Sequence, residues 1–344
     1  MNKVDDASPV VATVILLCYR QKDTIARAIE SLLRQDCPYR YEILVADDGS
    51  DDGTREICSE YAGRFPDIFR MLPLGKNKGL IDNYFDAVIA ARGKYVADCA
   101  GDDEWLDSRR LQLQIEALNA DPTLSAVCCG VEVFNVAEGR SHVSRGSLFG
   151  DDSVGELRAS GPDVLRGALD SVAGLPFVLS GALFRRDPVV RVLEENPGIL
   201  RCYDGGVEDI PLICVLAEAG DVLSLPIVGY RYYIDGESLS NNLSYEKQYR
   251  FYASVSSMVR RLGKYYGFRP EDQIRYFRAK FLYMASLARL SGNKSLAADL
   301  KGRCAEWRMP LPLKARLHLL LLRLSPRKSA AGRKSEPGKE KNIV

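Results

Sequence analysis

Short apolar runs alternate with amphipathic stretches over the first 135 residues, and this alternation constrains the fold more than any other feature of the chain. Five apolar runs predict strands: 10–18, 41–47, 68–72, 95–99 and 125–134. Between them, four stretches carry apolar residues at helical spacing: 24–35, 55–62, 80–91 and 110–118. Continuously apolar strands alternating with helices predict an α/β fold, with a mostly parallel central sheet covered by helices on both faces.

The rest of the chain is patterned differently. Residues 136–175 are rich in Gly, Ser and Asp and predict a long loop, or a loop with one short helix. Strand-like patterns return at 177–187 and at 221–233, the latter a strand or a hairpin, and 207–220 predicts a helix that ends at Gly220. From Tyr245 onward the pattern is helical, in four segments: 245–266, 271–290, 295–307 and 313–324.

These patterns predict the domain organisation. We expect an N-terminal tail at 1–9, an α/β domain at 10–240, a C-terminal helical region at 241–326 and a disordered basic tail at 327–344. Ligands of such sheets bind at the carboxyl ends of the strands, so we expect the site of the α/β domain there.

Composition excludes several classes of function. The chain has 344 residues, of which 46% are hydrophobic and 27% charged, and its net charge of +1 gives no reason to expect a nucleic-acid partner. Its nine cysteines are scattered without a C-x-x-C, which argues against a zinc site or a disulfide framework and favours reduced thiols in the cytoplasm. The two histidines, His142 and His318, lie far from other metal-ligating residues, so acid–base chemistry must come from carboxylates.

Two segments bear on membranes. The apolar run at 10–18 follows Asp5 and Asp6 rather than a basic stretch, so it is expected to be a buried strand and not a signal peptide. The segment 310–328 is Leu-rich and basic, and two interpretations are open: packing on the rest of the protein, or docking on an anionic membrane surface with help from the basic tail. We therefore expect a cytoplasmic protein, with the inner face of the plasma membrane as a second location.

Acidic clusters follow two of the predicted strands. Asp47 and Asp48 end the second strand, and Asp102, Asp103 and Glu104 follow the fourth. Each cluster alone is ordinary, because Asp often caps helices. In a parallel sheet, however, both clusters lie at the same edge, and hard carboxylate oxygens there suit Mn²⁺ or Mg²⁺ bound together with the phosphates of a ligand. A nucleoside diphosphate derivative is the ligand that this edge predicts.

The order of these motifs resembles a known enzyme family. "VILLCYRQKDTIARAIESLLRQD", "YEILVADDGSDDGT", "KYVADCAGDDEW" and "VEDIPL" together resemble the inverting glycosyltransferases of family 2, which have the GT-A fold, and in particular the branch that builds bacterial surface polysaccharides. The resemblance covers about residues 10–240, and it implies a nucleotide-binding half at 10–135 and an acceptor half at 136–240. It implies transfer of a sugar, with inversion, from a nucleotide-sugar donor (usually a UDP-sugar) to a saccharide or lipid-linked acceptor, assisted by Mn²⁺ or Mg²⁺.

The resemblance also implies residue roles, carried over position by position. Leu17, Cys18 and Tyr19 match the segment that holds the nucleotide base, and Asp48 matches the carboxylate that binds it. Asp102 and Asp103 match the ribose and metal ligands. Asp209 matches the general base, with Glu208 beside it. Ser180, Gly181 and Arg231 match residues that line the donor and acceptor. Trp105 either stacks on a sugar or anchors the following helix.

The sequence departs from the family pattern at two positions. Ala100 stands where the first acid of the Asp-x-Asp pattern is usual, so the metal depends on Asp102 and Asp103, with Asp98 or Glu104 as further candidates. Arg20 stands where relatives often have Asn, and it either neutralises the diphosphate or is exposed. Two alternatives remain: a nucleotide-sugar-binding protein without transferase activity, and a sugar nucleotidylyltransferase, which would need a Gly-rich basic loop that "VILLCYRQKD" lacks. A phosphoacceptor receiver-like module is disfavoured, because the chain is too long for that alone and Glu208 and Asp209 would have no role.

Overall fold

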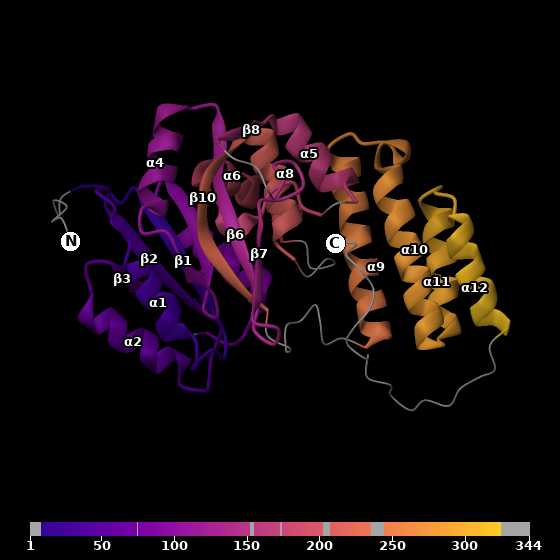
Figure 1. Cartoon of the computed structure of the whole chain (residues 1–344), viewed down its shortest axis with the longest axis horizontal. Helices are drawn as coiled ribbons and strands as arrows, with labels where there is room; N and C mark the ends of the chain where they lie inside the picture. The colour runs from indigo at the N-terminus through magenta and orange to yellow at the C-terminus, as the bar shows by residue number, and fades with distance from the viewer. Residues whose placement is uncertain are drawn as a thin grey trace. The chain divides into compact units, whose positions relative to one another are not determined.

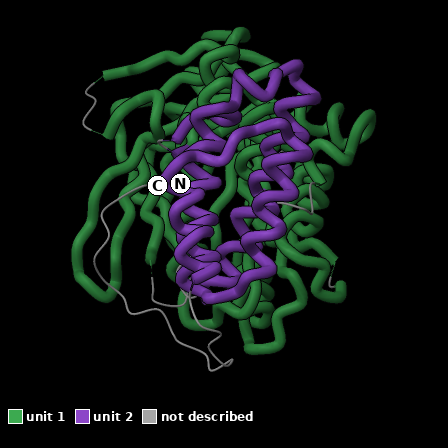
Figure 2. Tube along the Cα trace, turned by 90° about the vertical axis from the view of Figure 1, so that its right-hand side faces the viewer, with its two compact units in different colours: residues 1–167, 175–202, 208–234 green, residues 168–174, 203–207, 235–344 purple. Residues whose placement is uncertain are grey.

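The computed structural model describes residues 8–73, 75–151, 155–172, 174–201, 207–234 and 244–324. The chain divides into two compact units, coloured separately in Figure 2. Unit 1 contains Met1–Gly167, Leu175–Cys202 and Glu208–Ile234, and unit 2 contains Ala168–Gly174, Tyr203–Val207 and Asp235–Val344. The predicted basic tail at 327–344 lies outside the described residues, and the domain boundaries expected from the sequence stay predictions.

The described residues of unit 1 form a mixed sheet of ten strands, several of which are labelled in Figure 1. The main path of the sheet runs β3-β2-β1-β4-β9-β6-β10-β5. The strands are β1 (Ala12–Cys18), β2 (Tyr41–Asp47), β3 (Phe69–Met71), β4 (Tyr95–Ala100), β5 (Glu104–Trp105), β6 (Leu124–Asn135), β7 (Arg140–Ser144), β8 (Leu157–Ala159), β9 (Leu183–Arg185) and β10 (Asp221–Ile234). β1, β2, β3 and β4 pair in parallel, as the apolar runs predict, and β10 pairs with β6 in parallel as well. The β4–β9 and β9–β6 pairs are antiparallel.

Helices cover both faces of the parallel strands. The helices of unit 1 are α1 (Ile25–Leu33), α2 (Thr54–Arg64), α3 (Leu80–Ala90), α4 (Arg110–Ala120), α6 (Arg186–Glu195), α7 (Pro197–Leu200) and α8 (Asp209–Ala219), and α5 (Gly161–Asp170) crosses the boundary between the units. One core cluster joins α1, α2 and α4 to alternate residues of the strands, such as Tyr95, Ala97 and Cys99 of β4. Because successive strand residues point to opposite faces, the residues between them face α3, whose Tyr84 bonds Asp98.

Two predictions about local structure are wrong. Residues 136–175 contain β7, β8 and α5 rather than a loop with at most one helix. The segment 177–187 is mostly not a strand: a 3₁₀ turn at Leu179–Gly181 comes first, then the three-residue β9, and α6 begins at Arg186. A Cβ at Gly181 would lie 2.7 Å from the carbonyl oxygen of Cys129, so the turn fits against β6 only because residue 181 has no side chain.

The described part of unit 2 at 244–324 contains a set of four helices, as predicted. They are α9 (Tyr245–Tyr265), α10 (Ile274–Ser291), α11 (Lys294–Glu306) and α12 (Leu313–Leu324), with a 3₁₀ turn at Pro270–Gln273. α10 packs against the other three, through buried residues that include Phe277, Phe281 and Met284. No helix in the described part of the chain has the length and hydropathy needed to cross a bilayer.

A candidate nucleotide-sugar site

The carboxyl ends of three parallel strands place the predicted site residues at one edge of the sheet. The register pairs Cys18 with Asp47 and Leu17 with Ala100, so β1, β2 and β4 end level with one another. From β1, the sheet continues to β2 and β3 on one side and to β4 on the other, so a topological switch point lies between the parallel strands β1 and β4. Ligands of open α/β sheets bind at such a switch point, outside the carboxyl ends. The segments 17–19 and 100–103 flank this point.

Gly101 allows these two segments to approach closely. A Cβ on residue 101 would lie 2.5 Å from Oε1 of Gln21, 2.8 Å from Cδ1 of Ile25 and 3.1 Å from Cβ of Cys18. The backbone N–H of Gly101 also donates to the carbonyl of Leu17 at 2.8 Å. The acidic turn after β4 is therefore held directly against the turn after β1.

Asp48 is buried, and its side-chain carboxylate binds backbone amides of a neighbouring loop. Its Oδ1 accepts from the N–H of Lys78 and its Oδ2 from the N–H of Gly79, both at 2.9 Å. The turn that follows Asp48 needs glycine, because Gly49 has φ +81° and a Cβ there would lie 3.1 Å from the amide nitrogen of Asn77. A carboxylate oxygen can accept more than one hydrogen bond, so Asp48 keeps acceptor capacity for a ligand.

Asp103 is the most enclosed acid of the β4 turn. Its Oδ2 accepts from the Tyr230 hydroxyl at 2.8 Å, and its Oδ1 accepts from the N–H of Tyr233 at 2.9 Å. Burial, reinforced by the charge of Asp102, raises the pKa of Asp103 to about 7, although both hydrogen bonds oppose the shift. Asp103 thus ties the acidic turn to β10.

Asp102 is half-buried, and a cation lies beside its backbone. Arg27 of α1 donates from Nη2 to the carbonyl oxygen of Asp102, and its guanidinium lies 4.0 Å from the centroid of the Tyr233 ring. Sequence reasoning missed Arg27 and Tyr233. Arg27 is the one charged residue in the core-facing turn between Ile25 and Ile29, which is the only local signal that marks it.

A metal ion at this edge would need donor atoms from a bound substrate in addition to those of the protein. Within the described ranges, no group of three or more His, Cys, Asp or Glu side chains is arranged to hold a metal ion. Mg²⁺ and Mn²⁺ are often held by one or two carboxylates together with substrate phosphates. Asp102 and Asp103 fit that mode as protein donors, and Ala100 contributes none.

The N-terminus of α8 adds two more carboxylates. Glu208 precedes the helix and Asp209 begins it. Burial raises the pKa of both groups, and the charge of Asp209 raises that of Glu208 further. The same charge acts on Asp98 of β4, whose pKa is raised to about 7, mainly by burial. Asp98 accepts a hydrogen bond from the Tyr84 hydroxyl at 3.1 Å, so it faces α3.

The remaining predicted residues occupy different environments. Trp105 is 1% exposed, its Nε1 donates to the carbonyl of Asp98, and the Arg110 guanidinium lies 3.8 Å from the centroid of its ring. This packing favours the anchor interpretation over sugar stacking. Arg110 also donates to the carbonyl of Ser180 at 2.9 Å, and so positions the 180–181 segment.

Two arginines already have carboxylate partners. Arg231 pairs with Glu104 at 2.9 Å and with Glu132 at 2.8 Å. Arg20, which has φ 54°, makes two 2.7 Å hydrogen bonds to Asp51 at the surface. Each must exchange or share these contacts in order to bind a diphosphate.

Comparison with known families decides the class of protein. Residues 13–192, more than half of the chain, match the family described as glycosyl transferase family 2. The chain belongs to glycosyl transferase family 2. Membership supports a glycosyl-transfer activity.

Curated relatives match over a shorter range. An uncharacterized protein of Mycobacterium tuberculosis, Rv1520, is 36% identical over 116 residues, which are 34% of this chain and 33% of that protein. Putative glycosyltransferase EpsE of Bacillus subtilis is 32% identical over 123 residues, 36% of this chain and 44% of EpsE. The putative teichuronic acid biosynthesis glycosyltransferase TuaG of the same organism is 32% identical over 106 residues, 31% of this chain and 41% of TuaG. The match to Rv1520 thus spans about a third of either protein.

Solved structures of low identity share the fold over most of the chain. A mannosyltransferase of Pyrobaculum calidifontis, in complex with GDP-Man and Mn²⁺, has a TM-score of 0.52 at 18% identity, covering 93% of this chain and 86% of that one. TarS 1–349 of S. aureus, in complex with UDP-GlcNAc, has a TM-score of 0.52 at 16% identity, covering 92% of each. The fold of this family 2 member is therefore of the GT-A type, as expected.

Proposed function

We propose that this family 2 protein transfers a sugar, with inversion, from a UDP-sugar to a saccharide or lipid-linked acceptor in cell-envelope polysaccharide synthesis. The observation that supports the proposal best is the level ending of β1, β2 and β4, which brings Asp48 and the 102–103 pair to one switch point. Asp48 and the 17–19 segment are assigned to the base. Asp102 and Asp103 are assigned to the ribose and to a divalent metal.

Inversion needs a base that deprotonates the acceptor hydroxyl on the face opposite the leaving group, and we assign this role to Asp209. A carboxylate with a raised pKa is a stronger base than an ordinary one, at the expense of needing a higher pH to ionise. Burial raises the pKa of Asp209. A divalent metal, when bound, would stabilise the negative charge that develops on the departing diphosphate.

Substituting the base tests this mechanism. Asp209→Asn should lower the rate of transfer by about 10²–10⁴-fold, as is typical for loss of a general base. Asp187→Asn is the matched control, because Asp187 is an exposed acid in the first turn of α6 and stands outside the proposed site. Near-normal transfer by a folded Asp209→Asn protein would rule out the assigned role.

A binding experiment separates a working transferase from a protein that only binds nucleotide sugars. Nucleotide sugars, tested by thermal shift with and without Mn²⁺, should raise the melting temperature because a ligand of the native state stabilises it. Release of UDP in the presence of Mn²⁺ would then show turnover. Binding without any hydrolysis or transfer would favour the inactive alternative, and no shift with any nucleoside diphosphate would contradict the whole proposal.

We also propose a peripheral contact of α12 with an anionic membrane, at the inner face of the plasma membrane. α12 has two apolar faces, and the inward face consists of Ala315, Leu319 and Leu322, all buried. The outward face carries five leucines at helical spacing: Leu313, Leu317, Leu320, Leu321 and Leu324. Leu313 is 82% and Leu324 72% exposed.

Charge favours an anionic lipid surface as the occupant of this outward face. At 100° per residue, Lys314 lies on one side of the leucines and Arg316 and Arg323 lie on the other. Cations flanking an apolar face are typical of helices that lie in the membrane interface. The segment 327–344, next in the sequence, holds six Lys or Arg against two Glu.

Vesicle flotation tests this contact. The full chain should float with phosphatidylcholine vesicles that contain phosphatidylglycerol, and Leu317→Gln combined with Leu320→Gln should reduce the floated fraction several-fold. Ile89→Gln with Val136→Gln is the control, because both residues are exposed apolar side chains of unit 1. Equal flotation of the two double variants would end the membrane proposal.

A further inference from the structure

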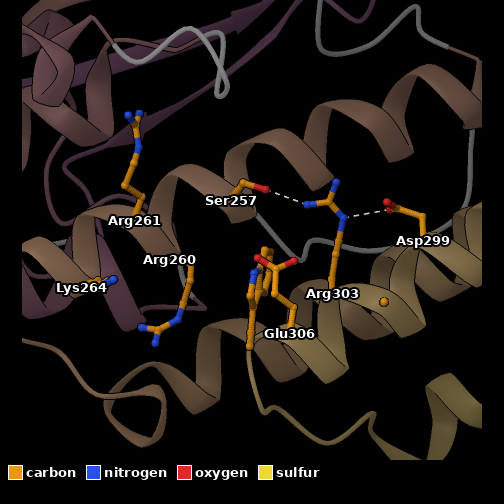
Figure 3. A pocket seen from close by; sticks show the side chains of 9 residues that line it. Ser257, Arg260, Arg261, Lys264, Asp299, Arg303 and Glu306 are labelled. Atoms are coloured by element: carbon orange, nitrogen blue, oxygen red, sulfur yellow. Dashed lines mark hydrogen bonds and ion pairs between the residues drawn. The ribbon is translucent and has the colours of Figure 1, made fainter.

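A pocket of about 610 Å³ lies between α9 and α11 of unit 2, within one compact unit and apart from the residues assigned to sugar transfer (Figure 3). Each helix contributes a stripe of residues with the i, i+3, i+4 and i+7 spacing of one helix face. The stripe of α9 consists of Ser257, Arg260, Arg261 and Lys264, and that of α11 of Asp299, Gly302, Arg303 and Glu306. Trp307, just after α11, completes the lining.

Arg303 connects the two helices that form the pocket by hydrogen bonds. Its Nη1 donates to Oγ of Ser257 at 2.6 Å and to the carbonyl of Ala253 at 3.2 Å, and its Nε donates to Oδ2 of Asp299 at 2.8 Å. Figure 3 shows this arginine reaching from α11 between Ser257 and Asp299. The same Asp299 oxygen also accepts from the Tyr249 hydroxyl at 2.7 Å. Arg303 and Asp299 therefore neutralise each other while they fix the spacing of the two helices.

The charges that remain are mostly positive. Arg260 and Lys264 have no carboxylate partner in the described ranges, and Arg260 bonds only the neutral Oε1 of Gln273, at 3.1 Å. Glu306 is the one other carboxylate of the lining. The buried indole of Trp307 adds an apolar wall. Guanidinium and ammonium groups beside an apolar wall suit a phosphate ester, because charge-assisted hydrogen bonds to phosphate are strong and Arg binds its oxygens in pairs.

Gly302 supplies an independent observation. Glycine inside a helix costs about 1 kcal/mol relative to alanine. A Cβ at residue 302 would meet no atom within 4 Å, so packing does not explain the absence of a side chain. Because Gly302 lines the pocket, any larger residue there would project into space that a ligand can occupy.

We propose that this pocket binds a phosphate-bearing ligand, with Arg260 and Lys264 contacting the phosphate and Trp307 contacting its apolar portion. The proposal is separate from sugar transfer and does not depend on it. The phosphate can belong to a lipid headgroup or to a soluble phosphorylated compound, and the two sources require the same chemistry from the pocket.

Titration of the full chain tests the proposal. Inorganic pyrophosphate is titrated calorimetrically in EDTA, so that binding which needs a divalent metal is suppressed. Phosphatidylcholine vesicles with and without phosphatidic acid form a second arm. Arg260→Gln with Lys264→Gln removes the two charges, and Gly302→Leu fills the pocket at a position with open space. Arg250→Gln with Lys301→Gln is the control, because both are exposed cations of α9 and α11 outside the lining.

We expect pyrophosphate, phosphatidic acid vesicles or both to bind the wild type, and both pocket variants to weaken that binding at least tenfold while the control variant stays within twofold. Binding to the vesicles alone identifies a lipid headgroup as the source, and binding of free pyrophosphate identifies a soluble source. Absence of binding in both arms overturns the proposal. Equal weakening by the pocket and control pairs also overturns it, because that result indicates general surface charge.

Discussion

Replacing Asp98 by Asn should stabilise the protein strongly at pH 8 and much less at pH 5. Asp98 is buried on the α3 side of β4 and accepts a hydrogen bond from the Tyr84 hydroxyl at 3.1 Å. Burial raises the pKa of Asp98 from 3.8 to about 7. Because the folded pKa lies above the unfolded one, the folded state binds more protons between pH 4 and 7, and stability falls as the pH rises through that window.

The size of the effect follows from the pKa difference. A shift of about three pKa units corresponds to about 4 kcal/mol between the two protonation states. The pKa of about 7 already includes the hydrogen bond from Tyr84, so the gain at pH 8 is about 4 kcal/mol. At pH 5 the carboxyl is mostly protonated in the folded state but still mostly ionised in the unfolded state, so the gain falls to about 2 kcal/mol, and it disappears only below about pH 4.

Urea unfolding at the two pH values measures this difference. The chain has two tryptophans, and a Trp307→Phe background leaves Trp105 of unit 1 to report the transition that contains Asp98. Asp121→Asn is a control with the opposite sign. Hydrogen bonds from Thr123, with help from Arg158, lower the pKa of Asp121 to about 2, so its removal should destabilise at neutral pH. An equal effect of Asp98→Asn at both pH values would refute the reasoning.

Three further predictions concern packing. Gly101→Ala should lower the unfolding free energy by about 1–3 kcal/mol by overpacking, and it should weaken nucleotide-sugar binding in the thermal-shift assay. An unchanged melting temperature would mean that the 2.8 Å contact with Ile25 relaxes freely. Arg70→Met should lower the unfolding free energy by about 2–4 kcal/mol, because it removes the half-buried cation that pairs with the buried carboxylate of Glu42. Urea unfolding within about 0.5 kcal/mol of wild type, the scatter of surface substitutions, would contradict this expectation. Leu319→Ala should cost about 2–4 kcal/mol and Leu320→Ala under about 0.5, because only the former is buried, and equal costs would contradict the two-faced packing of α12.

The parallel half of the sheet could be predicted from the sequence because its strands are buried on both faces and therefore continuously apolar. β2 begins and ends where predicted, and β4 extends one residue further, to Ala100. β7 and β8 could not be predicted in this way. β7 is exposed at Arg140, Ser141 and His142, so its pattern lacks a buried face, and it is fixed by its antiparallel partner β6.

The position of the candidate site residues at one sheet edge could be predicted only for residues that follow strand ends. Asp48 and Asp102 stand next to the strands that position them, so local sequence places them at the edge of the sheet. Arg27 lies 75 residues from Asp102, and Tyr233 lies 130 residues from Asp103. Such contacts depend on how α1 and β10 pack in three dimensions, and neither residue carries a local pattern that reveals its partner.

Backbone recognition by Asp48 has a consequence for protein engineering. The loop after β3 is bound through the amides of Lys78 and Gly79, and a main-chain contact tolerates a change of side chain at residue 78. Lys76 and Asn77 are exposed beside these anchor points. A library randomised at 76 and 77 would vary the rim of the proposed site while its backbone frame stays in place, so it would test whether this loop influences the choice among the proposed donors.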